Sequence, residues 1–287
     1  MRFCRTMSVF QAILLGIIQG LTEFVPISST AHLTIAQFLL KIRDADIAHS
    51  FDLVLHLGTA LALIVATWRL LIGIVSEGFL VLRGRPAANE TDRALIVPIV
   101  VGTIPGVLAG LFLLKRFESF RTLTSIGVAM FAACAFFLVS ERVGEARRSS
   151  ERDLSRINLL DAVLVGLAQA AAGLLPGLSR SGMTIATGRL RGLTREDATR
   201  FSFLLALPII LGAGAKTLLD LRKDHGPSIG AAPLVAGFVA SAVVGYIAVE
   251  FLLRYLKTHT LRPFAAYLGL LGVALLVASR FGSWGGP

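Results

Sequence analysis

Two segments of the chain repeat each other at an offset of 150 residues, and this internal repeat is the strongest constraint on the fold. The copies differ in their polar residues, because the first carries Glu23 and His32 whereas the second carries Arg180. Duplicated bends with unlike polar groups predict one composite site where the repeats meet. The shared positions are Gly16, Gln19, Pro26, Ser29, Thr34, Ile35 and Ala36, which recur as Gly166, Gln169, Pro176, Ser179, Thr184, Ile185 and Ala186.

The composition is that of an integral membrane protein. The chain is 55% hydrophobic and 16% charged, with a mean hydropathy of +0.75, whereas soluble domains carry about 25% charged residues. Apolar stretches run from end to end, which excludes a soluble domain on a single anchor. The net charge of +10 is attributed to basic cytoplasmic loops facing anionic headgroups. No motif that reads nucleic acid is present, and the two cysteines lack metal-ligand spacing.

Apolar runs and their interruptions predict the membrane segments. The regions 9–40 and 159–190 are broken at Pro26 and Pro176 into pieces too short to cross a bilayer, and such pieces are typical of re-entrant helical hairpins. Uninterrupted runs of spanning length lie at about 51–69, 94–114, 122–140, 201–219, 232–253 and 264–280.

The expected fold is therefore an all-α polytopic integral membrane protein with one membrane domain over 1–287. Its first repeat covers 8–140 and its second 158–280, and each is a re-entrant hairpin followed by three transmembrane helices. Three spans per half is an odd number, so the repeats must have inverted topology, with the hairpin tips near the midplane. A further span at 72–82 would make the halves parallel, but this segment is too short.

The distribution of basic residues predicts the orientation. This topology places 16 Lys and Arg residues on one face and 11 on the other, and the richer face is expected to be cytoplasmic. Both termini then lie outside, in a multi-pass protein of the bacterial inner membrane. The charged stretch 141–156 between the halves is expected to be a solvated loop without chemistry.

The first bend combines a carboxylate, hydroxyls and a histidine. Gln19 and Glu23 lie four apart, on one helix face, and a carboxylate at membrane depth costs about 2.5–3.5 kcal/mol. A structural partner or a function must offset this cost. Ser28 and Ser29 follow the break. Either serine could cap the next helix, or the free N–H groups at the start of that helix could bind phosphate beside the two hydroxyls. His32 lies on the same face and is a candidate base or nucleophile.

The second bend supplies a fixed cation. Arg180 has the forked geometry that suits phosphate, and it either binds substrate or pairs with Glu23. Its neighbours add hydroxyl donors and a glycine that permits close approach of a ligand: Ser179, Ser181, Gly182 and Thr184. Asp52 and His56, four residues apart on the first span, either flank the site or pair with each other.

At these residues the chain resembles the undecaprenyl-diphosphate phosphatases, the bacitracin-resistance family. The motifs are Gln19–Phe24 (QGLTEF) with Pro26–His32 (PISSTAH), and Pro176–Gly182 (PGLSRSG). The resemblance implies removal of the terminal phosphate from the C55 isoprenoid diphosphate that carries cell-wall precursors. It also implies a divalent cation, Mg²⁺ or Ca²⁺, and a site that opens to the periplasmic side.

Position by position, the resemblance makes Glu23, Ser29, His32 and Arg180 the catalytic set. It gives substrate binding to Gln19, Ser28, Ser179, Arg180, Ser181, Gly182 and Thr184. Many members carry glutamate where this chain has Gln19, so a metal would depend mainly on Glu23, with Gln19 beside it.

The expected reaction is attack on the terminal phosphorus by Ser29 or His32, or by water that they position, while Arg180 and the ion neutralise charge. Inverted repeats also occur in secondary carriers, so the alternative is a lipid-carrier flippase, or a phosphatase that also flips its product. The other partners expected are membrane lipids. The sequence is compatible with a homodimer and does not determine the oligomeric state.

Overall fold

A computed structural model of the chain describes residues 7–42, 44–113, 122–223 and 229–281. Within these ranges the regular elements are helices, apart from one isolated bridge between Arg152 and Leu193. Six of the described helices are long and apolar enough to cross a membrane, with mean hydropathies of 1.6 to 2.3. The all-α, multi-pass membrane character is thereby confirmed. Both chain ends, whose side the sequence predicts, lie outside the described residues.

Two pairs of short helices carry the bends. α1 (Val9–Phe24) and α2 (Ser29–Leu39) form the first pair, and α6 (Leu159–Leu174) and α7 (Arg180–Leu190) form the second. The first helix of each pair has 16 residues and the second has 11. Equal lengths in both pairs follow from the internal sequence repeat.

Local sequence explains where α1 and α6 begin and end. Each starts with a capping box, from Ser8 in α1 and from Asn158 in α6, which satisfies N–H groups that have no partner within the helix. Each stops at an extended residue that precedes a proline, Val25 or Leu175. Steric clash with the proline ring disfavours the α conformation at that position, so both helices end at the predicted breaks.

The two bends differ in length by one residue. α1 and α6 start 150 positions apart, whereas α2 and α7 start 151 apart. The sequence repeat pairs Ser29 with Ser179 without a gap, but in the structure the residues that precede the second helices are Ser28 and Ser179. Ser29 therefore takes the same helical position as Arg180. The offset returns to 150 at the starts of α3 and α8.

The first long helix, α3, is longer than the apolar run at 51–69 suggests. It runs without interruption over Ala45–Leu82, 38 residues, which is about 57 Å at 1.5 Å per residue. The run predicted to span the membrane at about 51–69 lies inside this helix, and 72–82 continues the same helix. The buried Glu77 carboxylate accepts the N–H groups of Ala88 and Asn89 and so ties the end of α3 to the start of α4.

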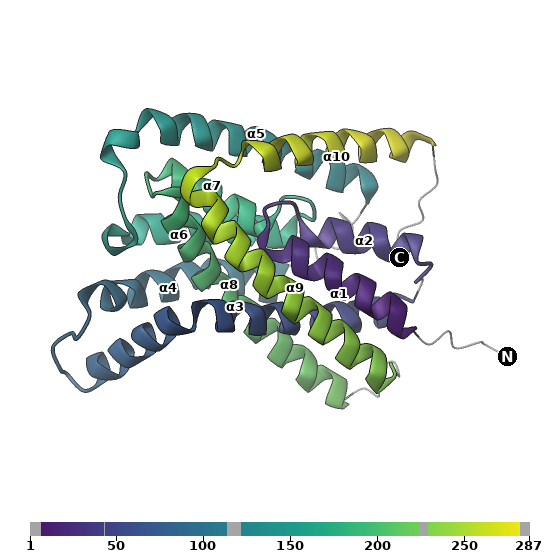
Figure 1. Cartoon of the computed structure of the whole chain (residues 1–287), viewed down its shortest axis with the longest axis horizontal. Helices are drawn as coiled ribbons and strands as arrows, with labels where there is room; N and C mark the ends of the chain where they lie inside the picture. Colours follow the sequence, from purple (N-terminus) through teal and green to yellow (C-terminus); the bar gives the residue numbers. More distant parts are fainter. Residues whose placement is uncertain (1–6, 43, 114–121, 224–228, 282–287) are drawn as a thin grey trace.

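The other long helices match the predicted runs with longer ends. They are α4 (Glu90–Leu108), continued by the π-helical turn η1 (Ala109–Leu113), α5 (Leu123–Ala146), α8 (Arg195–Lys223), α9 (Ala231–Thr258) and α10 (Arg262–Phe281). In Figure 1, α5 and α10 lie side by side along one edge, α9 crosses α1, and α4 lies beside α6.

Close glycine contacts interlock the two halves of the chain. A side chain at Gly16 in α1 would lie 2.6 Å from the carbonyl oxygen of Gly237 in α9. A side chain at the equivalent Gly166 in α6 would strike the carbonyl oxygen of Gly102 in α4. Small residues let helices in membranes approach this closely. Each short first helix is thus packed on a long helix from the opposite half.

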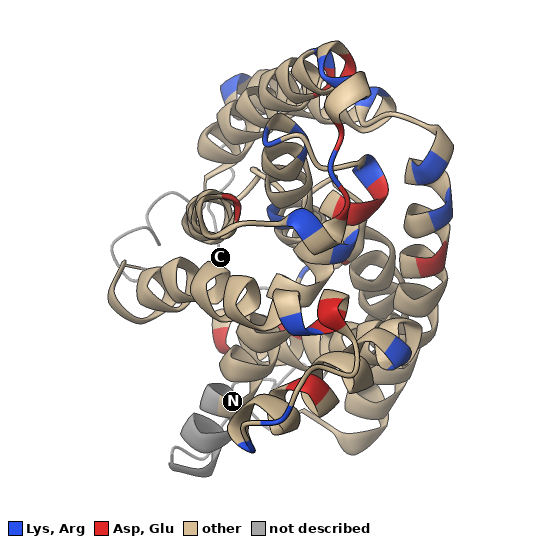
Figure 2. Cartoon of the chain, turned by 90° about the vertical axis from the view of Figure 1, so that its left-hand side faces the viewer, with Lys and Arg blue, Asp and Glu red and all other residues tan. Residues whose placement is uncertain are grey.

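Charged residues gather at one end of the bundle, the end that faces the viewer in Figure 2. The stretch 141–156 is predicted from the sequence to be a solvated loop, and this prediction is wrong for the first part of the stretch. Glu141 belongs to α5, is fully buried, and accepts from Arg195 Nη2 at 2.5 Å and from the Leu261 N–H at 2.9 Å. The short 3-10 turns η3 (Arg148–Ser150) and η4 (Leu154–Arg156) follow it.

Candidate active site

Both bends place a serine in the left-handed backbone region just before the second helix. Ser28 has φ 72° and ψ 90°, and Ser179 has φ 62° and ψ 98°. Such a conformation costs a non-glycine residue about 1–3 kcal/mol and is common at functional sites. It turns the chain sharply, so that Ser29 and Arg180 become the first residues of α2 and α7.

Glu23 is the centre of the site. Its carboxylate is buried and accepts from Arg180 Nη2 at 2.5 Å on Oε1. On Oε2 it accepts from Ser29 Oγ at 2.7 Å and from Gln19 Nε2 at 2.9 Å. His56 Nε2 lies 3.4 Å from the same oxygen. The hydrogen bonds and the positive charge of Arg180 offset the cost of burying this carboxylate.

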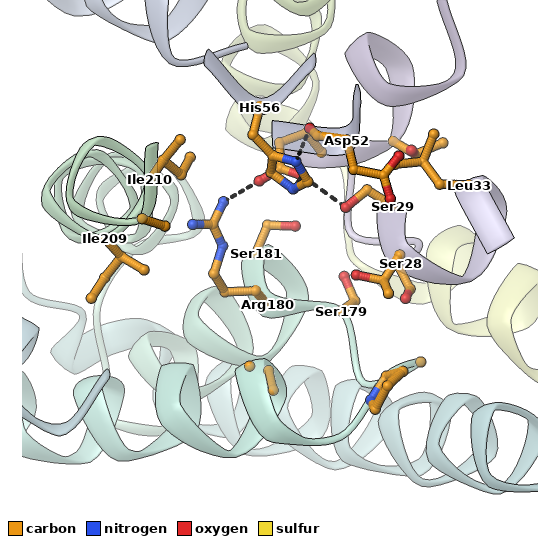
Figure 3. A pocket seen from close by; sticks show the side chains of 18 of the residues that line it. Ser28, Ser29, Leu33, Asp52, His56, Ser179, Arg180, Ser181, Ile209 and Ile210 are labelled. Carbon is orange, nitrogen blue, oxygen red and sulfur yellow. Dashed lines mark hydrogen bonds and ion pairs between the residues drawn. The ribbon is translucent and has the colours of Figure 1, made fainter. Parts of the chain in front are cut away.

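A cavity of about 300 Å³ lies against this cluster. Figure 3 shows Ser29 and His56 facing Arg180 across it, with Ile209 and Ile210 of α8 on one side. The volume is at the lower end of the range for small-ligand sites. Its walls combine hydroxyl groups, a cation and apolar side chains, which suits a charged headgroup joined to a hydrocarbon chain.

The predicted site residues divide into two groups around this cavity. The cavity is lined by Glu23, Ser28, Ser29, Ser179, Arg180 and Ser181. Gln19 lies behind Glu23 and is fully buried. Gly182 packs against the ring of Phe137, and Thr184 bonds Ser202 Oγ at 2.6 Å. Thus Gly182 and Thr184 shape the second bend from behind, and neither is among the described residues that line the cavity.

His32 points to a different neighbour. Its Nδ1 lies 2.8 Å from the Ser28 carbonyl oxygen, and its Nε2 lies 2.6 Å from the hydroxyl of Tyr267 on α10. It is not among the described cavity-lining residues. Both ring nitrogens therefore have partners other than Ser29.

The sequence allowed Asp52 and His56 either to flank the site or to pair with each other, and it did not identify other residues of the site. Both residues line the cavity, and the Nδ1 of His56 bonds the backbone carbonyl of Asp52 at 2.7 Å. The Asp52 carboxylate instead accepts from Gln37 Nε2 at 2.6 Å. His49, one turn before Asp52, also lines the cavity, and its spacing along α3 was a signal available in the sequence. No local pattern pointed to Tyr267, which is 235 residues from its partner.

A divalent cation fits this site through oxygen ligands. Mg²⁺ in phosphoryl-transfer sites is held by one or two carboxylates together with substrate phosphates. Glu23 supplies a carboxylate, and the amide oxygen Oε1 of Gln19 is buried beside it without a hydrogen-bond partner. Among the described residues, no three His, Cys, Asp or Glu side chains form a metal cluster. An ion here would therefore depend on phosphate oxygens from the substrate.

Comparison with known proteins identifies the family. The sequence model of the family named bacitracin resistance protein BacA matches residues 12–274, which include both bends. The chain belongs to this family. Its relatives include proteins named undecaprenyl-diphosphatase: one from Geotalea daltonii is 42% identical over 96% of this chain and 100% of its own length. Another, from Moorella thermoacetica, is 40% identical over 95% of this chain and 98% of its own.

The similarity to these relatives extends over nearly the whole chain. A third relative of the same name, from Rubrobacter xylanophilus, is 40% identical over 94% of this chain and 99% of its own length. Because the alignments span nearly all of both chains, the similarity includes the long helices that hold the bends together.

Proposed function

We propose that this BacA-family protein is an undecaprenyl-diphosphate phosphatase, which releases inorganic phosphate and returns undecaprenyl phosphate to cell-wall synthesis. The observation that carries this function is the contact of Ser29 and Arg180 with opposite oxygens of Glu23. Nucleophile, base and cation then line one cavity, whose lining also includes apolar side chains. Turnover of the carrier lipid in this way also accounts for bacitracin resistance.

Ser29 is the nucleophile in this mechanism. Its hydroxyl already donates to Glu23 Oε2, so Glu23 takes the proton as Ser29 Oγ attacks the terminal phosphorus. A bond forms between Oγ and phosphorus, and the bond between phosphorus and the bridging oxygen breaks. Undecaprenyl phosphate leaves with that oxygen and takes the proton back from Glu23. The regenerated carboxylate then accepts a proton from water as the water oxygen attacks the phosphoserine. The bond between Oγ and phosphorus breaks, Ser29 Oγ regains that proton from Glu23, and inorganic phosphate leaves.

Arg180 stabilises the phosphoryl group during transfer. Its guanidinium is bound to Glu23 at 2.5 Å, and phosphate oxygens of the substrate would compete for the same donors. A bidentate contact to phosphate is what the planar guanidinium offers and an ammonium does not. Ser179 and Ser181, on either side of it, provide hydroxyl donors for the diphosphate.

Glu23 would hold a divalent cation, Mg²⁺ or Ca²⁺, together with phosphate oxygens of the substrate, and the Gln19 amide oxygen would lie beside it. When bound, this ion supplies positive charge that neutralises the phosphate oxygens as the anhydride bond breaks. The unpartnered Gln19 oxygen beside the carboxylate supports this assignment.

The two helix pairs are re-entrant hairpins that enter the membrane from opposite sides, within repeats of inverted topology. Equal helix lengths, six spans and the meeting of the bends at Glu23 and Arg180 support this arrangement. α1 begins and α10 ends at one edge of the bundle, opposite the charged end (Figures 1 and 2). That charged end is cytoplasmic by the positive-inside rule, so the termini are outside and the site opens to the periplasm.

Phosphate release from a C55 or C15 isoprenyl diphosphate by purified protein in detergent tests the function, with and without chelator and alongside Arg180→Ala. Release that requires metal and is lost in the variant is the expected result. Binding of the lipid diphosphate without any release from folded protein would contradict a phosphatase and favour a carrier.

A further inference from the structure

Tyr267 holds His32 in one orientation. The Tyr267 hydroxyl lies 2.6 Å from His32 Nε2, and the two rings stack with centroids 5.7 Å apart and planes 13° apart. On its other side, His32 Nδ1 lies 2.8 Å from the Ser28 carbonyl oxygen. A carbonyl oxygen only accepts, so Nδ1 carries the proton, Nε2 accepts, and the tyrosine hydroxyl donates. The Ser28 carbonyl therefore sets the tautomer of His32, and Tyr267 holds the ring in position from the other side.

His32 in turn holds the strained bend before Ser29. Ser28 has a left-handed backbone and makes no side-chain cap for α2. Its carbonyl oxygen instead accepts twice from His32, from the ring Nδ1 at 2.8 Å and from the backbone N–H at 3.3 Å. A left-handed serine persists only where its surroundings hold it. The ring of His32 is the side chain that bonds the carbonyl of this serine.

The second bend provides an internal comparison. Ser179 has the same left-handed backbone, but its own hydroxyl accepts the Gly182 N–H at 3.3 Å. With the offset of 151 residues, the position of His32 is taken by Met183, which has no ring nitrogen. The second bend thus closes on its own side chain, whereas the first depends on His32 and, through it, on Tyr267.

The helix that carries Tyr267 is itself well anchored. Side chains at Gly127 of α5 and Gly272 of α10 would each lie 2.9 Å from the other residue's carbonyl oxygen. This close packing fixes α10 on α5, and Tyr267 lies five residues before Gly272. The tyrosine hydroxyl is therefore presented from a rigid pair of helices.

We infer that Tyr267 is a positioning residue for the phosphatase reaction, which aligns Ser29 with Glu23 by holding His32 against the Ser28 carbonyl. This inference rests on the proposed role of Ser29 as nucleophile. In this inference His32 supports the bend before Ser29, and α10 controls the geometry of that bend through Tyr267.

The test is a double-mutant cycle on phosphate release between Tyr267→Phe and His32→Ala. Tyr267→Phe keeps the stacked ring and removes only the hydroxyl, so kcat should fall about tenfold, the effect of weakening one positioning hydrogen bond, with KM unchanged. In the His32→Ala background the same change should have no further effect. Tyr246→Phe on α9 is the matched control, because Tyr246 is 41% exposed and Tyr267 is 42% exposed, and it should keep wild-type kcat.

Two results would overturn the inference: an unchanged kcat in Tyr267→Phe, or an equal loss from Tyr267→Phe with and without His32. The thermal midpoint of each variant in detergent separates misfolding from misalignment, since a general loss of folding would persist in the His32→Ala background. Ser29→Ala distinguishes the two proposals. If Ser29→Ala retains wild-type turnover, the proposed mechanism fails; if it is inactive while the cycle is additive, only the inference about Tyr267 fails.

Discussion

Ser29 and Arg180 occupy equivalent positions in the two bends and bind opposite oxygens of one carboxylate. Each is the first residue of its short second helix, and each hydrogen-bonds Glu23, at 2.7 Å from Oε2 and 2.5 Å from Oε1. The position equivalent to Glu23 in α6 is Gly173, whose Cβ would meet open space. In the proposed mechanism, one repeat thus supplies the nucleophile and the base, and the other supplies the cation and room for the substrate.

Replacing Glu23 by glutamine should abolish most turnover. The amide keeps the size of the side chain but cannot take the Ser29 proton, and loss of a general base costs about 10²–10⁴-fold. The measurement is kcat for phosphate release from farnesyl diphosphate. Glu145→Ala is the control and should behave like wild type, because Glu145 lies at the charged end and pairs with Arg262. Equal rates for Glu23→Gln and Glu145→Ala would contradict the mechanism.

Lysine should not replace Arg180. Arg180→Lys keeps the charge but loses the bidentate fork, so KM for the lipid diphosphate should rise and kcat should fall, though less than in Arg180→Ala. The exposed Arg254, which pairs with Glu250 on the same helix, offers the control substitution Arg254→Lys. A fully active Arg180→Lys would show that charge alone is sufficient.

The metal proposal predicts that chelation removes activity and that Gln19→Leu raises the concentration of Mg²⁺ needed for half-maximal rate. The leucine fills similar space without an oxygen ligand. Binding of Mn²⁺, followed by electron paramagnetic resonance, gives a readout that does not depend on turnover. Unchanged metal affinity in Gln19→Leu would assign the ion to other ligands.

Contact between the two halves should depend on Gly166. A Cβ at this position would strike the backbone of Gly102 in α4, so Gly166→Ala should force the helices apart and destabilise the protein by about 1–3 kcal/mol. Gly78→Ala in α3 is the matched control, because its Cβ would meet no atom within 4 Å. There the substitution should leave stability unchanged or raise it by about 0.5–1 kcal/mol. Thermal unfolding in detergent compares the two.

The charged end should lose stability in acid. Burial by itself raises the pKa of Asp161. Hydrogen bonds from Arg152, Arg191 and the Asn158 N–H together lower this pKa by more than burial raises it, so the pKa lies below its ordinary value. A carboxyl with a lowered folded-state pKa stabilises the fold above its unfolded pKa of about 3.9. That contribution is lost as the pH falls from this value through the folded-state pKa. Asp161→Asn should destabilise at pH 7 and reduce the acid-dependent loss, as measured by thermal midpoints.

Much of the fold was predictable because it depends on local composition. Hydropathy located the six helices of the described residues that are long and apolar enough to cross a membrane. The prolines at 26 and 176 located both bends, since proline disfavours the α conformation at the residue before it. The full length of α3 was not predicted, because Arg69 resembles a membrane boundary, whereas the helix continues through apolar residues to Leu82. The one-residue difference between the bends was not visible either, because it depends on the left-handed backbone of Ser28 and Ser179.

The sequence by itself determined the membrane class, the duplicated bends and the chemical types at the site, because periodicity, length and side-chain chemistry are local properties. Only the tertiary structure decided which of these side chains meet. Glu23 contacts Arg180 across 157 residues and His32 contacts Tyr267 across 235. Such contacts follow from how the helices pack, through Gly16 on Gly237 and Gly166 on Gly102, and no spacing along the chain encodes that packing.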